Sequence, residues 1–481
     1  MKPPRWRRVH RRRSQAEVGE PSSRQRARSS EPRKVGKPSS RQRARSSEPR
    51  NELVGKGKGH HEIQKAWTDW TPWSQEAHNF EVNFDTLANT RQRFPRSLRA
   101  LNSYSVPTAV AIGPYHRGLR NLKSMDKVKK VAAYHFVRES GSSFGNIHTE
   151  VTKKESDALD FYGWNYEVDG MGQRRFLDML FLDACFLLQY MVKCTCPPDM
   201  QPPSLWSFFD TNQAVISEDI MLLENQLPWV VLDALKIFKN VDVLGFVAKM
   251  GRTLQVRKER GRETFKLGTH RPPHLLGVLW YYKTGSRTDD VPIPIRDGLK
   301  PVSRTVSAIE LAEIGIGLKA SKTAKFTDMG INKVPFFANI FLPPVLLDHV
   351  RASWLVNMVA FEECLGMARG TRNPSVVSSY IAILAMLMDR EEDVHRLRED
   401  GVVQGELTNR ELLDFLKTLI RLISGGDLYS HIIEEVEDYK DKWWMWIIVH
   451  KFFYKSWKAI AGVLTIVAVL VAILNLNRHW K

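Results

Sequence analysis

The chain has 481 residues, of which 43% are hydrophobic and 26% charged, and its formal net charge is +18. Such a composition is typical of a globular protein with two or three domains, or with one large helical domain, and it excludes a chain that is disordered throughout. Residues 1–60 carry 19 Lys and Arg against 5 Asp and Glu, whereas residues 61–481 carry 52 against 48. The basic character therefore belongs to an N-terminal arm, and the rest of the chain is nearly neutral.

The N-terminal arm contains an internal repeat, because PSSRQRARSSEPR occupies residues 21–33 and returns at residues 38–50. Its Arg/Ser-rich sequence lacks apolar periodicity and cannot bury enough surface to offset the entropy of ordering, so we expect residues 1–60 to be disordered. Ser29 and Ser46 each lie three residues after an arginine, which is typical of sites for basophilic kinases. A solvated extension, a transit peptide, or a contact for nucleic acid or anionic lipid all fit this composition.

A Trp-rich linker, residues 61–91, is expected to follow the arm. Its WTDWTPW stretch at residues 67–73 has the three-residue spacing of an aromatic stripe that packs on the body. The cysteines that would hold a thrombospondin-type repeat are absent from it.

The cysteine content argues against a disulfide framework and against a zinc site. The chain has 4 cysteines, and no second Cys/His pair stands at zinc-like spacing from Cys194 and Cys196. The sequence also lacks an Asn-x-Ser/Thr acceptor and an apolar stretch after the first Met. We therefore expect free thiols, a non-secretory setting, and neither a metal nor another cofactor.

The body, residues 92–442, is predicted to be a mainly α, multi-helix globular domain with few short strands. Helical periodicity of apolar residues is clear in four segments, which are residues 176–191, 352–364, 378–397 and 407–423. Thr408 is the predicted N-cap of the last of these helices, with Glu411 at the capping-box position. FKLGTH (265–270) and VPIPI (291–295) are the strand-like pieces.

An unusual polar triplet, Glu224, Asn225 and Gln226, interrupts the otherwise apolar run IMLLENQLPWVVL (220–232). On a helix, Glu224 would share a face with Ile220 and Leu227, but Pro228 cannot donate the hydrogen bond that a continuous helix needs at that turn. We therefore predict that one helix ends or kinks here and the next begins. The triplet is interpreted as a structural polar knot, with a binding surface and a catalytic acid as the alternatives.

The segment GPYHRG (113–118) is predicted to be a turn, because Gly113 and Pro114 begin it and Gly118 ends it. His116 and Arg117 offer an anion-binding pair, and His116 is also a candidate base. Packing of His116 against the core is the alternative that loops of this kind favour.

Motifs for catalysis are not apparent in the sequence. GIGLKASKT (315–323) lacks the glycine directly before the lysine that a phosphate-binding loop requires, and His60-His61-Glu62 lacks the helical spacing of two zinc ligands. Neither a nucleophile elbow nor a glycine-rich nucleotide fingerprint is present. We therefore do not predict an enzyme.

The C-terminal region has the pattern of a membrane anchor. Aromatic and lysine residues in 443–457 predict an interfacial segment, residues 458–476 a single transmembrane helix, and residues 477–481 a short tail. Trp457 and Lys458 on one side and Trp480 on the other are predicted to lie at the two interfaces, because 23 helical residues span about 34 Å. The flanking lysines favour a cytosolic body. A buried core helix is the alternative.

Several segments together resemble a plant protein family, domain of unknown function 247. The similar segments are VPTAVAIGPYHRG (106–118), the stretch 125–130, LDACFLLQ (182–189), LLENQLPWVVL (222–232), SAIELAEIGIGLKASK (307–322), FEEC (361–364), EDVHRLREDGVV (392–403) and the lysine-flanked C-terminal span. The resemblance covers residues 92–476 and departs at SAIEL and in the repeated arm. It implies a largely helical plant membrane protein without an established catalytic activity, and the association of some members with self-incompatibility in grasses implies recognition.

The sequence thus favours a membrane-anchored, non-enzymatic recognition or signalling protein that binds an unknown protein partner. Binding of nucleic acid or anionic lipid through residues 1–60 is the first alternative. An enzyme that uses Glu224 and His116 is the second.

Overall fold

The structure is a computed structural model, and it describes residues 93–163, 170–196, 204–255, 265–285, 306–323, 325–334, 336–369, 375–423 and 430–479. All of them belong to one compact unit, Trp70–Lys481. The predictions made for residues 1–92, including the disordered arm, Ser29, Ser46 and WTDWTPW, lie outside these ranges, as do VPIPI and Trp480.

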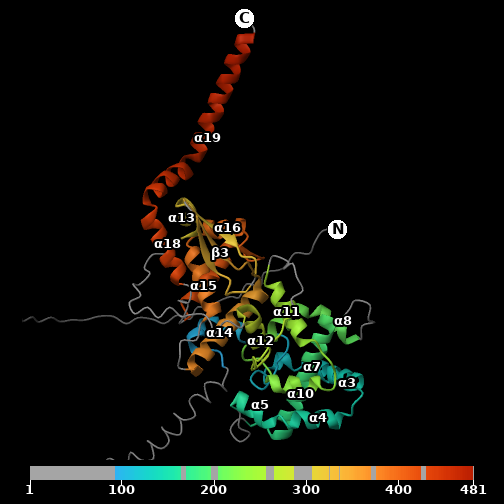
Figure 1. Ribbon diagram of the computed structural model, residues 1–481. Helices are drawn as coiled ribbons and strands as arrows, with labels where there is room; N and C mark the ends of the chain where they lie inside the picture. The colour runs from blue at the N-terminus through green and yellow to red at the C-terminus, as the bar shows by residue number, and fades with distance from the viewer. Residues whose placement is uncertain are drawn as a thin grey trace, which may run out of the picture. The chain divides into compact units, whose positions relative to one another are not determined.

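Helices make up most of the described chain (Figure 1), as the sequence predicted. The first half contains two 3-10 helices and eight α-helices: η1 (Arg96–Tyr104), η2 (Arg120–Leu122), α3 (Met125–Ser140), α4 (Phe144–Thr152), α5 (Glu155–Tyr162), α7 (Gln173–Thr195), α8 (Ser204–Thr211), α9 (Gln213–Asp219), α10 (Trp229–Lys236) and α11 (Val243–Thr253). The second half contains α12 (Leu275–Thr284), α13 (Ala308–Glu313), α14 (His349–Arg369), α15 (Val376–Leu387), α16 (Glu391–Glu399), α17 (Asn409–Ile420), α18 (Ser430–Lys442) and α19 (Trp444–His479).

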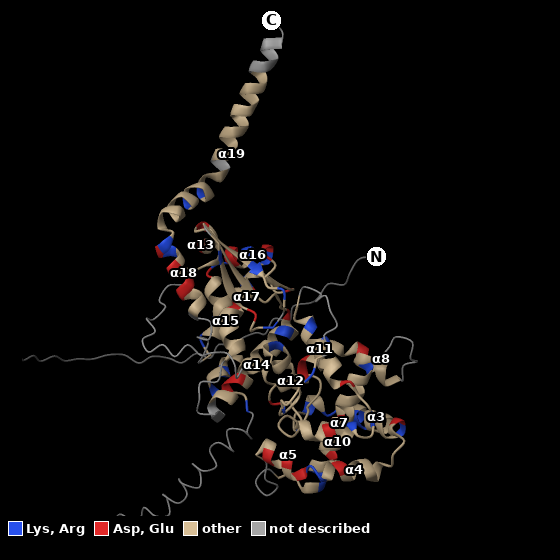
Figure 2. Cartoon of the chain, viewed as in Figure 1, with Lys and Arg blue, Asp and Glu red and all other residues tan. Residues whose placement is uncertain are grey.

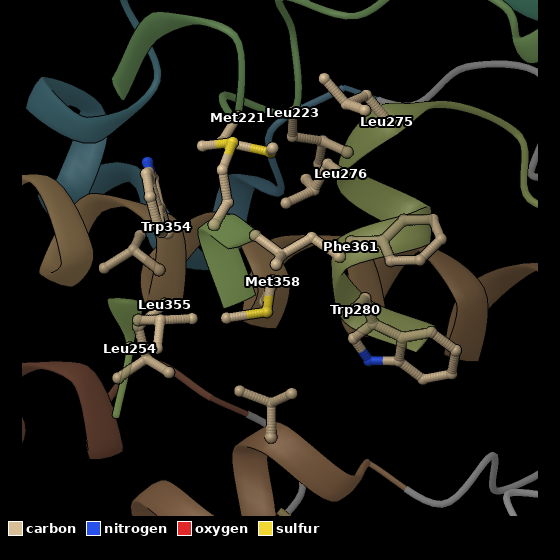
Figure 3. Close-up of a cluster of buried hydrophobic side chains, with 14 of the residues drawn as sticks. Met221, Leu223, Leu254, Leu275, Leu276, Trp280, Trp354, Leu355, Met358 and Phe361 are labelled. Atoms are coloured by element: carbon tan, nitrogen blue, oxygen red, sulfur yellow. The ribbon is translucent and has the colours of Figure 1, made fainter. Parts of the chain in front are cut away.

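Helix α7 is the centre of the first half, and its sequence explains why. It is apolar on every side, so α3, α4, α8, α10 and α11 all pack against it. Helix α14 is the centre of the second half, and it contacts α12 and α15 there and η1 and α9 of the first half. Figure 3 shows the core around α14, in which Leu355, Met358 and Phe361 meet Met221 and Leu276 from other parts of the chain.

The helix predicted for residues 407–423 is α17, and Thr408 caps it as expected. The Thr408 hydroxyl accepts a hydrogen bond from Glu411 N, and the Glu411 carboxylate accepts one from Thr408 N. Leu412, Leu416 and Leu419 are buried along one face of this helix. Full burial of each such side chain contributes about 1.5–3 kcal/mol, so this stripe fixes the helix on the body.

The few short strands predicted for the body are present, but the strands that the structure describes lie outside the segments that looked strand-like, and three of them form a small mixed sheet. Its strands β1 (Ile316–Ala320), β3 (Phe337–Leu342) and β2 (Gly330–Val334) lie in that order, with β1 parallel and β2 antiparallel to β3. Two shorter strands, β4 (Val345–Leu346) and β5 (Val403–Gln404), pair in parallel. GIGLKASKT therefore supplies a strand rather than a loop, whereas FKLGTH, which was expected to be strand-like, contains no strand.

The single helix expected over residues 378–397 was wrong, because α15 ends at Leu387 and α16 begins at Glu391. The backbone N–H groups of Asp389 and Arg390 donate to the carboxylate of Asp393 at 3.1 and 3.0 Å instead of to helix carbonyls. Asp393 also accepts from Ile309 N at 3.0 Å. Its side chain thus ends one helical run and ties α16 to α13.

The C-terminal helix α19 is bent. The direction of the helix changes by 62° between its two parts, Trp444–Trp457 and Ile460–Ile473. Within the described residues no single straight helix is long and apolar enough to cross a bilayer, although these two parts together meet the criteria of length and composition. The single transmembrane helix over residues 458–476 therefore stays a prediction.

Candidate functional site

The polar triplet lies where one helix ends and the next begins, as predicted, but residues 220–227 form turns rather than a helix. Helix α9 ends at Asp219, and α10 begins at Trp229 directly after Pro228. Trp229 N donates to Pro273 O at 2.8 Å, so the first amide of α10 is paired outside its own helix. The chain between Asp219 and Trp229 needs other hydrogen-bond partners, because its backbone groups are mostly buried.

The partner of these turns is the segment 108–113, which contains no helix or strand, is exposed at Thr108 and is buried from Val110 to Gly113. Thr108 N donates to Asp219 Oδ1 at 2.9 Å, while Ala109 N and Val110 N donate to Oδ2 at 2.7 Å each. Val110 is fully buried, so its amide, left unpaired, would cost about 1–3 kcal/mol, whereas Thr108 is exposed. Burial raises the pKa of Asp219, although these three N–H donors act in the opposite direction.

Asn225 continues the same row of contacts. Its Oδ1 accepts from Ile112 N at 2.6 Å, and its Nδ2 donates to Val110 O and to Asp219 O at 2.9 Å each. An amide is the side chain that can accept and donate at once, so Asn225 pairs both the N–H and the C=O groups of the two segments.

A buried ion pair completes this row. Gly113 N donates to Asp183 Oδ2 at 2.9 Å, and the other oxygen of Asp183 lies 2.5 Å from Lys129 Nζ. Lys129 also donates to Ala111 O. Both side chains are almost fully buried, so loss of one partner would leave an uncompensated charge in the core, at about 3–5 kcal/mol.

Gln226 links the turns to other helices. Its Nε2 donates to Ile220 O and Leu222 O at 2.8 Å each, and its Oε1 accepts from Leu276 N at 3.0 Å, in the first turn of α12. The hydroxyl of Tyr162 donates to Gln226 O at 2.9 Å. Gln226 therefore joins the turns to the start of α12.

We call Lys129, Asp183, Asp219, Asn225 and Gln226 the polar framework. Four of the segments that resemble the plant family take part in the polar framework: residues 125–130, 182–189 and 222–232 supply its side chains except that of Asp219, and residues 106–118 pair with them through the backbone. Only Asn225 and Gln226 were predicted from the sequence to have this role. Asp183 and Asp219 give the same signal as the triplet, an acidic residue next to or inside an apolar run. Their partners could not be found from the sequence, since 54 to 111 residues separate them along the chain.

Glu224 and His116 lie together at the edge of the polar framework. Glu224 Oε1 accepts from Phe94 N at 3.0 Å, and Glu224 Oε2 lies 3.5 Å from His116 Nε2. Arg93 lies 3.9 Å from Glu224 and stacks on the Tyr115 ring at 3.6 Å. Burial disfavours the charged carboxylate, but the contacts with His116, Phe94 N and Arg93 outweigh it and lower the pKa of Glu224.

Glu224, the candidate acid, and His116, the candidate base, therefore meet in this small cluster. The side chains of Glu224 and His116 are 16% and 11% exposed, so little of either reaches the surface. The turn 113–118 forms as predicted, with Gly113 at φ 71°. A carboxylate with a lowered pKa is a poor general acid at neutral pH, because it has already lost its proton.

Glu362, in the FEEC segment, forms a second buried polar contact. It accepts hydrogen bonds from Trp280 Nε1 at 2.9 Å and from the first-turn amides of α15, Val377 N at 2.8 Å and Ser378 N at 2.9 Å. Burial raises the pKa of Glu362 to about 7, in spite of these donors. Its position ties α14, α12 and α15 together at one point.

The predicted membrane segment is exposed from Gly462 to Ile473. Trp457 is 64% exposed, and Val463, Leu464 and Ile466 beyond the bend are 59–61% exposed. Figure 2 shows the described part of α19 beyond the bend without Lys, Arg, Asp or Glu. The side chain of Lys458 lies outside the described part of the chain.

Metal ligands are not grouped in the part of the chain that the structure describes, since no three His, Cys, Asp or Glu side chains there converge on a site for an ion. Cys185 and Cys364 are buried free thiols, and burial raises the pKa of each. Cys194 and Cys196 are thiols as well and are not joined in a disulfide.

Comparisons with known proteins agree with the resemblance. A family profile described as plant protein of unknown function, domain of unknown function 247, matches residues 92–471. The chain is similar to the UPF0481 protein At3g47200 of Arabidopsis thaliana, with 24% identity over 80% of this chain and 84% of that protein. It is also similar to the putative UPF0481 protein At3g02645 of the same plant, with 29% identity over 30% of this chain and 28% of that protein. No solved structure matches it.

Proposed function

The chain belongs to the plant family domain of unknown function 247, and from that premise we propose that it is a membrane-anchored protein whose helical body serves recognition rather than catalysis. The single observation that carries the proposal is α19, whose first part packs on the body and whose second part is apolar and exposed. Apolar side chains exposed along a whole helix are costly in water, and a bilayer removes that cost.

The proposed anchor has the arrangement of an interfacial helix followed by a span. The part Trp444–Trp457 carries lysines among aromatic residues, and Ile460–Ile473 carries no charged residue. At 1.5 Å per residue the second part alone is about 21 Å long, which is shorter than the hydrocarbon core of about 30 Å. A membrane crossing therefore also needs the helical residues that follow Ile473. We propose that residues 458–476 span the membrane and that the lysines before them keep the body in the cytosol.

The side chains of the polar framework are already paired within the protein, which favours a structural role over catalysis. The oxygens and nitrogens of the polar framework pair with backbone groups of 108–113 and of the turns after Asp219, so they have little capacity left for a substrate. Glu224 and His116 stay the candidates for an enzyme. Turnover of any substrate that is abolished by Glu224→Gln, in a variant with unchanged stability, would favour that alternative.

Anchoring is tested by alkaline carbonate extraction of membranes that contain the full chain. Leu464→Lys combined with Val467→Lys places two charges in the proposed span, at about 2.5–3.5 kcal/mol each near its centre. The matched control is Val215→Lys with Ile237→Lys, two exposed apolar side chains of the body. We expect the control to stay in the pellet like the wild type and the span variant to be released. Release of the wild type, or retention of the span variant, would contradict the proposal.

Recognition is tested by proximity labelling in plant cells with the full chain and with a chain that lacks residues 1–60. We expect the two to enrich the same partner proteins, because the body makes the contact. Loss of every partner with the arm would favour the alternative, binding of nucleic acid or anionic lipid through residues 1–60. That alternative also predicts a steep fall in affinity with salt.

A further inference from the structure

We propose that the β2–β3 turn and the first part of α19 form one surface that lies in the interfacial region of the bilayer and holds the body against the membrane. This inference rests on the proposed anchoring and adds a second point of contact to it. The aromatic face, as we name this surface, consists of Phe336, Phe337, Trp443, Trp446, Val449 and Phe453.

The turn between β2 and β3 presents aromatic side chains where a tight turn usually has glycine or asparagine. Phe336 has φ 72° and is the only non-glycine residue with positive φ in the described ranges. A bulky side chain in this conformation costs about 1–2 kcal/mol, so a compensating contact is expected. Phe336 and Phe337 are still 46% and 48% exposed, and Val334 across the turn is 48% exposed.

The first part of α19 is fixed to this turn rather than free of it. The Phe336 ring lies 4.9 Å from Trp443 and 5.2 Å from Trp446, measured between ring centroids. The Tyr439 hydroxyl of α18 donates to Phe336 O at 2.9 Å. Figure 1 shows α13 and β3 on the side of the body where α18 and α19 begin.

Helix α13 also contacts the first part of α19. His450 Nδ1 lies 2.9 Å from Glu313 O, and the Glu313 carboxylate lies 3.8 Å from Lys451 Nζ and 3.4 Å from Lys455 Nζ. The orientation of the body relative to the first part of α19 is therefore set by several contacts on two elements.

A hollow of about 390 Å³ opens in the aromatic face, lined by Phe336, Lys442, residues 443–446 and Val449. The indole N–H of Trp446 is buried without a hydrogen-bond partner in the part of the chain that the structure describes. Tryptophan side chains such as those that line this hollow are enriched at the level of lipid headgroups.

The occupant that fits this face is a phospholipid bilayer rather than another protein. The centres of protein interfaces are poor in lysine, whereas Lys442 lines the hollow among tryptophan side chains, as at a lipid headgroup layer. The face is also continuous with the exposed apolar helix Ile460–Ile473.

The experiment places the photo-crosslinking residue p-benzoylphenylalanine at single positions of the full chain, reconstituted in vesicles of phosphatidylcholine and phosphatidylserine. Phe337 tests the turn, Phe453 the first part of α19 and Val467 the proposed span. Phe144, which is 54% exposed on α4, is the matched control on the body. After irradiation, lipid adducts and cross-linked dimers are measured by mass spectrometry.

We expect lipid adducts at Phe337 and Phe453 about ten-fold above the Phe144 background, with Val467 higher still. Adducts at Phe453 and Val467 with background at Phe337 would overturn this inference and leave the anchoring intact. Background at all four positions would refute the anchoring itself. Cross-linking of Phe337 to a second copy in place of lipid would also overturn the inference and identify an interface between chains.

Discussion

Asp219→Asn removes one negative charge at the centre of the polar framework and leaves its shape nearly unchanged. The carboxylate accepts three backbone hydrogen bonds, of which the amide can keep the two from Ala109 N and Val110 N. Its NH2 group must then face Thr108 N, another donor. The lost bond to a charged acceptor is worth about 1.5–3 kcal/mol, and each bond that becomes neutral loses about 1 kcal/mol.

The neutral amide recovers part of this loss, because burial of the Asp219 carboxylate is itself unfavourable and raises its pKa. We therefore expect the free energy of unfolding to fall by about 2–4 kcal/mol, a large fraction of the 5–15 kcal/mol typical of folded proteins. The assay is guanidinium denaturation of the full chain in a mild detergent, followed by tryptophan fluorescence, with the requirement that the m value is unchanged.

The matched control is Asp210→Asn, which makes the same chemical change in a 62% exposed side chain paired with Lys193. Exposed ion pairs contribute about 0–1 kcal/mol, so the control should barely move the midpoint. Equal midpoint shifts in the two variants, or a loss below about 1 kcal/mol for Asp219→Asn, would refute the reasoning that this carboxylate holds the two segments together.

Two further predictions concern the same core. Gly113→Ala should destabilise the fold by more than about 2 kcal/mol, because the added Cβ would lie 2.7 Å from the Tyr162 hydroxyl at a residue with positive φ. The control Gly141→Ala has a similar φ but open space around the added Cβ, so it should cost about 1 kcal/mol. Equal denaturation midpoints for the two variants would contradict this prediction. Glu362→Gln should remove a pH dependence of the unfolding free energy. Because the pKa of Glu362 is raised to about 7 in the folded state, protonation of Glu362 stabilises the fold by about 3 kcal/mol below pH 4.5, and this stabilisation is lost as the pH rises through 7. The difference in unfolding free energy between wild type and Glu362→Gln, measured from pH 4.5 to 8, should fall with pH, and a constant difference would show that Glu362 is ionised throughout.

Local rules predicted the elements whose signals are local. The buried helix α7 follows from an apolar run longer than a strand, α17 from its leucine spacing and Thr408 cap, and the break before α10 from Pro228. Each of these depends on hydrogen bonds within a few residues, so the sequence alone is sufficient for them.

Long-range contacts account for most of what the sequence did not predict. The gap between α15 and α16 is a local exception: Asp393 accepts from two amides three and four residues before it, while the apolar periodicity continues through the gap and conceals this cap. The strands β1 and β3 pair across a chain separation that no periodicity encodes. The same holds for the polar framework, where Asn225 was identified as unusual but its partners in 108–113 were not identifiable.

The membrane topology of the full chain is the measurement that tests the proposed function most directly. Gly141→Asn creates an N-glycosylation acceptor with the two serines that follow it, at an exposed left-handed position that asparagine tolerates. A second acceptor is appended after Lys481 on a short flexible spacer. In microsomes we expect glycosylation only of the acceptor after Lys481, which places the body in the cytosol. Glycosylation only at the Gly141 position would reverse this orientation, and glycosylation of neither, with release of the chain by alkaline carbonate, would contradict the membrane anchor.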